Sequence, residues 1–427
     1  MLERNYQKSA LDELSVVLFA GGGGSDTGIS CMTGKPVDIA INHDADAIRM
    51  HKTNHPWTRH LQEDVFAVDP KEVCADQKVG ILWASPDCTH FSKARGGVPV
   101  KKEIRGLSWV VVKWALAVRP RVMFMENVEE IQTWGPCIET PKGLQPDPAR
   151  AGETFKGFLA MLTSGIAPDH PALKECCEFL HVSEGSTEAK RLIAGLGYDF
   201  GSKILCAADY GVPTIRKRWF AVFRCDGQPV KFPEPTHAKD GKDGRPLDIS
   251  EPIHTQTAKD RDALMITHIC KFKGDNIGQA SAEPLQTVTA SAGEFAAVKV
   301  TIERCKNGAG LGFWPKVRAL LNTYCGYDLG DDEIILLWIS GAAYFISDIG
   351  LRMLTPRELY NAMGFPPDYI IDRDYTGKEY KRSAQVARCG NAVCPPVAGA
   401  LVAANLKDCA LPHYIGTLSE LWERVSA

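Results

Sequence analysis

The sequence predicts an α/β fold in which a mostly parallel sheet is covered by helices on both faces, followed by a smaller, irregular β-rich region. Two observations predict this class. Short apolar runs alternate with helical segments through the first half of the chain, and a glycine-rich stretch directly follows the first run. The length of 427 residues exceeds one ordinary core, so two domains are expected.

The strands of the sheet are expected in the apolar runs. Helical segments lie between several of them, for instance at 109–117. Ligands of such sheets bind at the carboxyl ends of the strands, so candidate sites are sought there. The predicted strands are Leu14–Phe19, Val37–Ile41, Gly80–Ala84, Arg121–Met125, Lys203–Ala208 and Trp219–Phe223.

The first candidate site is the glycine-rich stretch Phe19–Gly28. Glycines let the backbone approach a ligand closely and adopt positive φ. Gly21 and Gly23 fit the start of a dinucleotide fingerprint, but Asp26 stands at its third glycine, which disfavours a nicotinamide cofactor. A tight structural turn is the alternative interpretation.

Acidic residues follow the next strand. Asp44 is placed to accept hydrogen bonds from ribose hydroxyls, and helix capping is an equally simple use for it. Asp64 and Val65 fit a site beneath an adenine ring, where the carboxylate accepts from the exocyclic amine and the valine packs on the ring. An exposed loop is the alternative for this pair.

The sharpest signal is Ser85–Ser92, S-P-D-C-T-H-F-S, directly after the Gly80–Ala84 strand. A cysteine is more often an inert small apolar residue than a nucleophile. Cys88 lies on a polar loop before a basic stretch, where a thiolate is exposed and electrostatically favoured.

Two further sites border later strands. Glu126 follows an apolar strand and is either a helix cap or a general acid. Arg216 and Arg218 precede the Trp219–Phe223 strand, and they either extend to solvent or point at a substrate carbonyl.

The formal net charge is −3, so bulk charge does not indicate nucleic-acid binding. Local clusters of basic residues do exist, and the alternative to a binding role is that they are solvated surfaces. We expect the segment after Cys88 to hold a DNA backbone through Ser92, Lys93, Arg95, Lys101, Lys102 and Arg105.

The remaining composition narrows the setting. Hydrophobic residues make up 44% and charged residues 24%, as in globular proteins, and no signal peptide or membrane span is visible. Fourteen cysteines with no secretory signal argue for reduced thiols in a cytoplasm, and the lack of a C-x-x-C pair predicts no metal.

These motifs together resemble the DNA cytosine-5 methyltransferases, phage-type or bacterial members with a P-D-C nucleophile motif. F-A-G-G-G is similar to the first cofactor motif, Glu126-Asn127-Val128 to the E-N-V motif, and Arg216-x-Arg218 to the R-x-R motif. The stretch from Arg352 to Pro366 is similar to the motif that closes the recognition domain, and Gly390-Asn391-Ala392-Val393 to the last cofactor motif. Six motifs in family order cover most of the chain.

The resemblance implies a Rossmann-like domain that uses S-adenosyl-L-methionine. The implied catalytic set has Cys88 attack carbon 6 of a flipped cytosine, Glu126 protonate ring nitrogen 3, Arg218 hold the carbonyl oxygen and Arg216 orient the loop. The implied cofactor contacts are Phe19, Ala20, Gly21, Gly23, Asp44, Asp64, Val65, Pro86, Asn391 and Val393.

The resemblance also divides the chain. It implies a catalytic domain at 1–234 with an insertion at about 134–197, a recognition domain at 235–350, and a C-terminal segment at 351–427. Within 235–350, Glu251–Ala258 is echoed by Glu283–Ala290, which predicts short strands that read base edges or two hairpins without a DNA role.

Departures and alternatives remain. His43 replaces the usual acid after the second strand, and Thr214 stands where many members have glutamine. A tRNA cytosine-5 methyltransferase would need only a small recognition region, and a catalytically silent DNA-binding regulator would not need Cys88, Glu126 and Arg218 together. We expect a monomer that binds double-stranded DNA, with a cognate restriction endonuclease as a candidate partner and no membrane association.

Overall fold

The computed structural model describes most of the chain. Its described residues are 13–87, 102–141, 143–237, 263–271, 279–280, 284–288, 290, 295–305, 310–324, 327–339 and 341–426. Cys88, Ser92, Lys93, Arg95 and Lys101 lie outside them, as does the first copy of the internal repeat.

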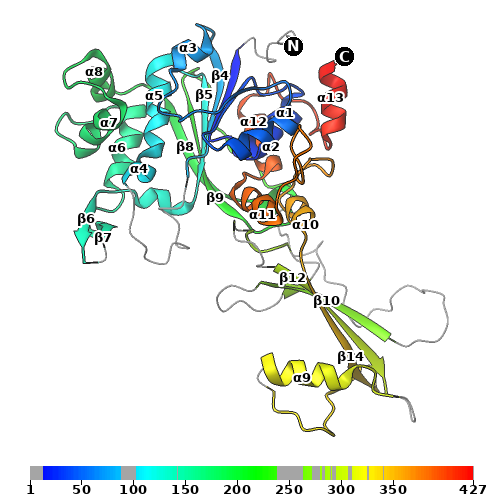
Figure 1. The fold of residues 1–427 in the computed structure, drawn as a ribbon. Helices are drawn as coiled ribbons and strands as arrows, with labels where there is room; N and C mark the ends of the chain where they lie inside the picture. The colour runs from blue at the N-terminus through cyan, green and yellow to red at the C-terminus, as the bar shows by residue number, and fades with distance from the viewer. Residues whose placement is uncertain are drawn as a thin grey trace.

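A seven-stranded sheet forms the centre of the larger part of the molecule, in the order β3-β2-β1-β4-β5-β9-β8 (Figure 1). All pairs among the first five strands are parallel, and β9 runs antiparallel to both of its neighbours. The predicted α/β class is therefore confirmed. The strands are β1 Leu14–Leu18, β2 Ile39–Ile41, β3 Arg59–Leu61, β4 Val79–Ala84, β5 Val122–Asn127, β8 Asp199–Cys206 and β9 Lys217–Arg224.

Helices cover both faces of this sheet because successive strand residues point to opposite sides. Val17 belongs to one hydrophobic cluster and Val16 to the other. The first cluster packs against helices α1 Gly24–Thr33, α2 Ala45–Asn54, α10 Pro356–Ala362, α11 Arg382–Asn391, α12 Pro395–Asn405 and α13 Leu418–Ser426. The second packs against α3 Pro70–Cys74, α5 Trp109–Val118, α6 Glu153–Leu162, α7 Pro171–Leu180 and α8 Thr187–Ala194.

The expected strand and helix positions agree closely with those observed on this half. The helix expected at 109–117 is α5, preceded by the short helix α4 (Lys102–Arg105). Strand β3 escaped prediction because its three residues, Arg59-His60-Leu61, carry no apolar run. The expected insertion contains the hairpin β6 (Cys137–Thr140) and β7 (Gly143–Pro146) together with α6, α7 and α8.

A second, five-stranded antiparallel sheet in the order β11-β10-β12-β14-β13 extends away from the first (Figure 1). One helix, α9 (Trp314–Tyr324), packs on it through the small cluster of Trp314, Val317, Leu321 and Phe345. The strands are β10 Ala263–Lys271, β11 Gln279–Ala280, β12 Phe295–Arg304, β13 Leu336–Ile339 and β14 Ala342–Met353.

The second copy of the internal repeat does not belong to this sheet. Leu285 forms a parallel bridge with Thr214, and its amide and carbonyl bond to Pro213 and Ile215 at 2.9 and 2.8 Å. Leu285 and Val288 are buried in the first cluster of the large sheet. The expectation that this copy reads base edges is therefore wrong for these two residues, whose apolar side chains are covered by the catalytic half.

One helical stretch within the described residues, Arg382–Asn405, is long and apolar enough to cross a membrane by length and composition. Two thirds of its apolar window, 67%, is buried inside the protein. It supplies Val386, Val397 and Leu401 to the core, which is the ordinary reason for an apolar helix in a globular protein.

Candidate active site

The proposed catalytic acid and arginine meet at one edge of the large sheet. Glu126 lies near the end of β5 and Arg218 near the start of β9, and the two strands are antiparallel, so these ends are adjacent. Arg218 Nε lies 3.1 Å from Glu126 Oε1, with side-chain exposures of 16% and 10%. A nearly buried ion pair is stable only when both partners are held in place.

One guanidinium nitrogen of Arg218, Nη2, is placed to bind a ligand. Its Nη1 donates to the carbonyl of Lys217 at 2.8 Å, and Nε faces Glu126. Among the described residues no hydrogen bond engages Nη2. The pair therefore combines a carboxyl group with a free guanidinium donor, which suits a ring that offers a nitrogen and a carbonyl oxygen side by side.

The segment that leads to Cys88, the predicted nucleophile, begins beside this pair. Cys88 is outside the described residues, but Pro86, two residues earlier, is buried, and Asp87 is exposed. The amide of Asn127 donates to the Pro86 carbonyl at 3.0 Å and its oxygen accepts from Val128 N at 2.9 Å. The residue after Glu126 thus fixes the backbone that leads to Cys88, a link that the E-N-V spacing did not show in advance.

Arg216 is buried next to the site and bonds to backbone carbonyls of the protein. It is 4% exposed, and its Nη1 donates to the carbonyls of Val288 at 3.1 Å and Gly390 at 3.0 Å. It therefore joins the R-x-R segment to the second repeat copy and to the last cofactor motif. Thr214, which departs from the family's glutamine, is fully buried and bonds the carbonyl of Gln286 at 3.3 Å.

A small cavity of about 10 Å³ lies beside Glu126, Arg216, Arg218 and Cys394. It is smaller than one water molecule needs, so a pyrimidine does not fit there. Cys394 is a thiol near the acid that sequence reasoning did not weigh as a nucleophile. Burial raises the pKa of Cys394 to about 11, which keeps it protonated and unreactive.

Most of the predicted cofactor residues follow the carboxyl ends of β1, β2, β3 and β4, which are neighbours in the sheet, and Asn391 and Val393 lie at the end of α11. Phe19 and Gly21 both have positive φ, 59° and 53°, and a Cβ at Gly21 would meet no side chain, so the turn leaves open space beside it. Gly24 and Gly28 serve packing instead, since a Cβ there would strike the carbonyls of Val393 and Pro395.

The acidic residues lie on the same edge. Asp44 is exposed and caps α2, accepting from the amides of Asp46 and Ala47. Asp64 is exposed and accepts from Phe66 N at 2.9 Å, while Val65 is buried. Ala20 and Val393 are buried, and Asn391 is exposed at the end of α11. An open glycine turn, exposed carboxylates and an apolar wall fit a nucleoside cofactor with a polar tail.

One expected DNA contact is placed differently. Arg105 is 3% exposed, and its Nη2 donates to the carbonyl of Gly135 at 3.3 Å. It therefore braces the insertion in this conformation and does not face a DNA backbone. Lys102 begins α4, and its side chain is outside the described residues.

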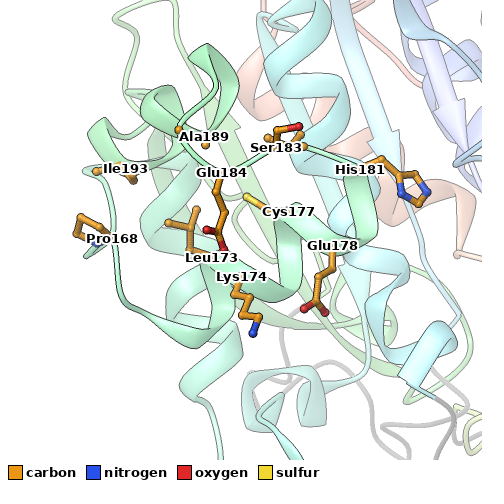
Figure 2. Close-up of a pocket in the computed structure, with 12 residues that line it drawn as sticks. Pro168, Leu173, Lys174, Cys177, Glu178, His181, Ser183, Glu184, Ala189 and Ile193 are labelled. Carbon is orange, nitrogen blue, oxygen red and sulfur yellow. The ribbon is translucent and has the colours of Figure 1, made fainter.

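A larger cavity, about 520 Å³, lies in the insertion between α7 and α8 (Figure 2). It contains none of the predicted site residues, and its lining mixes Lys174, Glu178 and Glu184 with a cysteine. Burial raises the pKa of that cysteine, Cys177, so it is no thiolate nucleophile. Within the described residues no group of three or more histidines, cysteines or carboxylates could hold a metal ion.

This sheet order, with β9 reversed beside β5, and the open turn after β1 define a methyltransferase that uses S-adenosylmethionine. The family model of C-5 cytosine-specific DNA methylases matches residues 15–135 and 187–407. The chain belongs to this family, which confirms the resemblance carried by the motifs. Residues 136–186, unmatched by the family model, fall within the expected insertion.

Individual relatives agree with this assignment. The chain is 28% identical to the type II methyltransferase M1.HphI of Haemophilus parahaemolyticus, over 91% of this chain and 86% of that protein. It is 27% identical to M.SacI of Streptomyces achromogenes over 54% of this chain, and the match spans about half, 53%, of M.SacI. A DNMT2 variant of Spodoptera frugiperda shares the fold, with 14% identity, 93% and 99% of the two chains covered, and a TM-score of 0.50.

Proposed function

We propose that this protein methylates carbon 5 of cytosine at a specific site in double-stranded DNA, with Cys88 as the nucleophile. The observation that carries the proposal is the Glu126–Arg218 pair at 3.1 Å, set beside the buried Pro86 that leads to Cys88. Family membership and the type II methyltransferase relatives support the same reaction.

The chemistry begins at an unreactive ring carbon. Addition of the Cys88 thiolate to carbon 6 breaks the 5,6 double bond and makes carbon 5 electron-rich. Glu126 gives a proton to nitrogen 3 during the addition, which neutralises the charge that would otherwise build up on the ring. Thymine already carries that proton, so the same group selects cytosine.

Arg218 and Arg216 have separate duties in this scheme. The free Nη2 of Arg218 donates to the ring carbonyl at position 2, while Nε keeps Glu126 in place. Arg216 is buried, and its Nη1 donates to the carbonyls of Val288 and Gly390. We therefore propose it as a positioning residue, the role that the R-x-R motif implies.

S-adenosylmethionine supplies the electrophilic methyl group when it is bound. Phe19, Ala20, Gly21, Gly23, Asp44, Asp64, Val65, Pro86, Asn391 and Val393 are the residues proposed to hold it. After methyl transfer, a base removes the carbon 5 proton, the 5,6 double bond reforms and the Cys88 thiolate leaves, while the proton on nitrogen 3 returns to Glu126. No described side chain is assigned to that base, and water is a candidate.

The target base must leave the duplex before Cys88 reaches carbon 6. Flipping costs a few kcal/mol, which phosphate contacts offset. Ser92, Lys93, Arg95, Lys101 and Lys102 are proposed for this backbone grip. The recognition region is proposed at 235–350, with the five-stranded sheet as its main body. Binding should weaken steeply as salt rises.

The finer setting also belongs to the proposal. The names of the type II relatives suggest a cognate restriction endonuclease as a partner. A monomer acting in the cytoplasm of a bacterial cell or phage-infected host remains our prediction. Size-exclusion chromatography with light scattering tests the monomer directly.

The decisive experiment traps the covalent step. Bisulfite sequencing of DNA from expressing cells first identifies the modified site. Duplexes with 5-fluorocytosine at that site are then incubated with protein and methyl donor, because fluorine cannot be removed as a proton and the adduct persists. We expect a denaturant-resistant complex attached at Cys88, and none with Cys88→Ala, which should still bind DNA.

Three results would overturn this function. Absence of any adduct with the wild-type protein would remove Cys88 as the nucleophile. Methyl transfer to tRNA, but not to duplex DNA, would assign the same chemistry to a different substrate. DNA binding without transfer to either substrate would indicate a silent regulator.

A further inference from the structure

A buried chain of polar side chains lies beneath the glycine turn. Asp26, in the first turn of α1, and His51, on α2, are both fully buried, and Oδ1 lies 3.0 Å from Nε2. The other ring nitrogen of His51, Nδ1, lies 2.9 Å from Nε2 of His60 on β3. The three side chains therefore form one chain of polar contacts across three elements, in which the contact between His51 and His60 is a hydrogen bond.

One member of this chain is held in its neutral form. Burial lowers the pKa of His60 to about 3, with the neighbouring His51 as the next cause, so His60 is neutral near neutral pH. One of the two facing nitrogens, Nδ1 of His51 and Nε2 of His60, therefore donates a proton to the other.

Two neighbours of the chain, Thr27 and His55, connect it to the backbone of the turn. Thr27, next to Asp26, donates its hydroxyl to the Gly23 carbonyl at 2.6 Å and lies 3.2 Å from Nε2 of His55. The rings of His55 and His51 are 4.5 Å apart. A Cβ at Gly23 would meet the Tyr369 hydroxyl and come within 2.8 Å of His55 Nε2, so the side chains of Tyr369 and His55 line the inner side of the turn.

The same chain connects the first turn of α1 to the last turn of α2. Helix α1 starts at the glycine turn, and α2 starts at Asp44, the proposed ribose contact. Asp26 belongs to the first and His51 to the second. A buried carboxylate is tolerated only with its donor at the right distance, so the pair restricts how α1 and α2 can shift relative to each other.

We propose that the Asp26–His51–His60 chain is a positioning device that holds the glycine turn of α1 against the last turn of α2 and thereby sets the affinity for S-adenosylmethionine. The inference rests on the cofactor-binding role proposed for this turn. It assigns no contact with the cofactor to the three side chains. It gives Asp26, which departs from the third glycine of the dinucleotide pattern, a function in place of that glycine.

The test measures cofactor binding separately from methyl transfer. Titration calorimetry gives the Kd for S-adenosylmethionine and for S-adenosylhomocysteine, and kinetics give KM for the cofactor and for DNA. We expect His51→Leu to raise both Kd values by about tenfold or more and to raise the cofactor KM, with the DNA KM within about twofold. His51→Gln retains a donor for Asp26 and should restore most of the affinity.

A matched control separates positioning from general destabilisation. Ser15→Ala removes a buried hydroxyl whose 2.8 Å bond to Asp38 joins β1 to the segment before β2, at the opposite end of these strands from the cofactor turn. It should lower the unfolding temperature without changing the Kd. Should His51→Leu fail to fold, His60→Gln at the half-buried end of the chain provides the test, with an expected rise of about threefold.

The outcomes are distinguishable. If wild type binds cofactor and the His51 and His60 variants bind it equally well, the positioning role is wrong, whatever the activity. If Ser15→Ala weakens binding as much as His51→Leu, the effect is only general loss of stability. If wild type binds cofactor but methylates no DNA, the proposed function fails while the positioning role can still be read from the Kd values.

Discussion

The two sheets of this protein differ in how much of each strand they bury. Every residue of β1, β2, β4 and β5 is buried, whereas β13 alternates exposed with half-buried residues, and β14 ends in three exposed ones. A sheet covered on both faces is rigid and holds chemical groups at fixed distances. A sheet with one open face can offer side chains to a large ligand, which suits the proposed division between catalysis and DNA recognition.

The largest expected effect comes from Glu126, at the edge of the seven-stranded sheet where the proposed reaction takes place. Glu126→Gln keeps the size of the side chain but removes its ability to give a proton to nitrogen 3. We expect kcat to fall by about 10²–10⁴-fold, the usual range for a general acid, with the Kd for DNA little changed. Single-turnover methyl transfer on the identified site measures it.

The matched control for Glu126→Gln is Glu130→Gln, a change on the same polypeptide segment just beyond β5. This variant should keep wild-type kcat. A Glu126→Gln variant that retains more than about a tenth of wild-type kcat would show that nitrogen 3 gains its proton from another source.

A second prediction compares one aromatic residue from each sheet. Phe124 on β5 is 1% exposed and stacks on Trp83, whereas Trp338 on β13 is 72% exposed. Phe124→Ala should cost about 3–5 kcal/mol of unfolding free energy because it leaves a cavity in a dense core. Trp338→Ala should change it by less than about 0.5 kcal/mol. Denaturant titrations measure both.

For DNA affinity, Trp338→Ala should have the larger effect of the two variants. Trp338→Ala should weaken specific DNA binding by roughly tenfold, since an exposed aromatic side chain on a recognition surface is a typical hot spot. Equal DNA affinity of Trp338→Ala and wild type would remove β13 from the proposed recognition surface. A large loss of stability in Trp338→Ala would show that the open face is covered.

The same difference in burial explains what could be predicted from sequence. Strands buried on both faces read as continuous apolar runs, so β1, β4 and β5 were located within two residues. Motif order then indicated Glu126, Arg216 and Arg218 as one site. The placement of Leu285 and Val288 in the core of the other half could not be predicted, because a bridge to Thr214 is a long-range contact with no local pattern.

The histidines beneath the glycine turn escaped sequence analysis for a related reason. His51 and His55 share one face of α2 by helical spacing, but nothing local indicates that Asp26 and His60 meet them. In the sequence, Asp26 stands out only because it replaces the third glycine of the dinucleotide fingerprint. A buried polar group and an exposed one look alike in sequence, and only the fold distinguishes them.

The smallest expected effect is a pH dependence that arises from this cluster. The unfolded chain has histidine pKa values near 6.5, whereas burial lowers the pKa of His60 to about 3 and that of His55 well below its usual value. Between about pH 3 and 6.5 the unfolded state therefore binds more protons, so stability is lost as pH falls below about 6.5. Between about pH 7 and pH 5, the unfolding temperature of His60→Gln should therefore fall by less than that of the wild type.

Using the difference between wild type and His60→Gln isolates this one group. Asp38 acts with the opposite sign, because burial raises its pKa to about 6 and its contribution is lost as pH rises toward that value. Asp38 is present in both proteins and cancels, as do Asp26 and Lys52 near the ring. If the unfolding temperatures of the two proteins fall equally between about pH 7 and pH 5, His60 is as easily protonated in the folded chain as in the unfolded chain. Its neighbours would then not hold it in the neutral form.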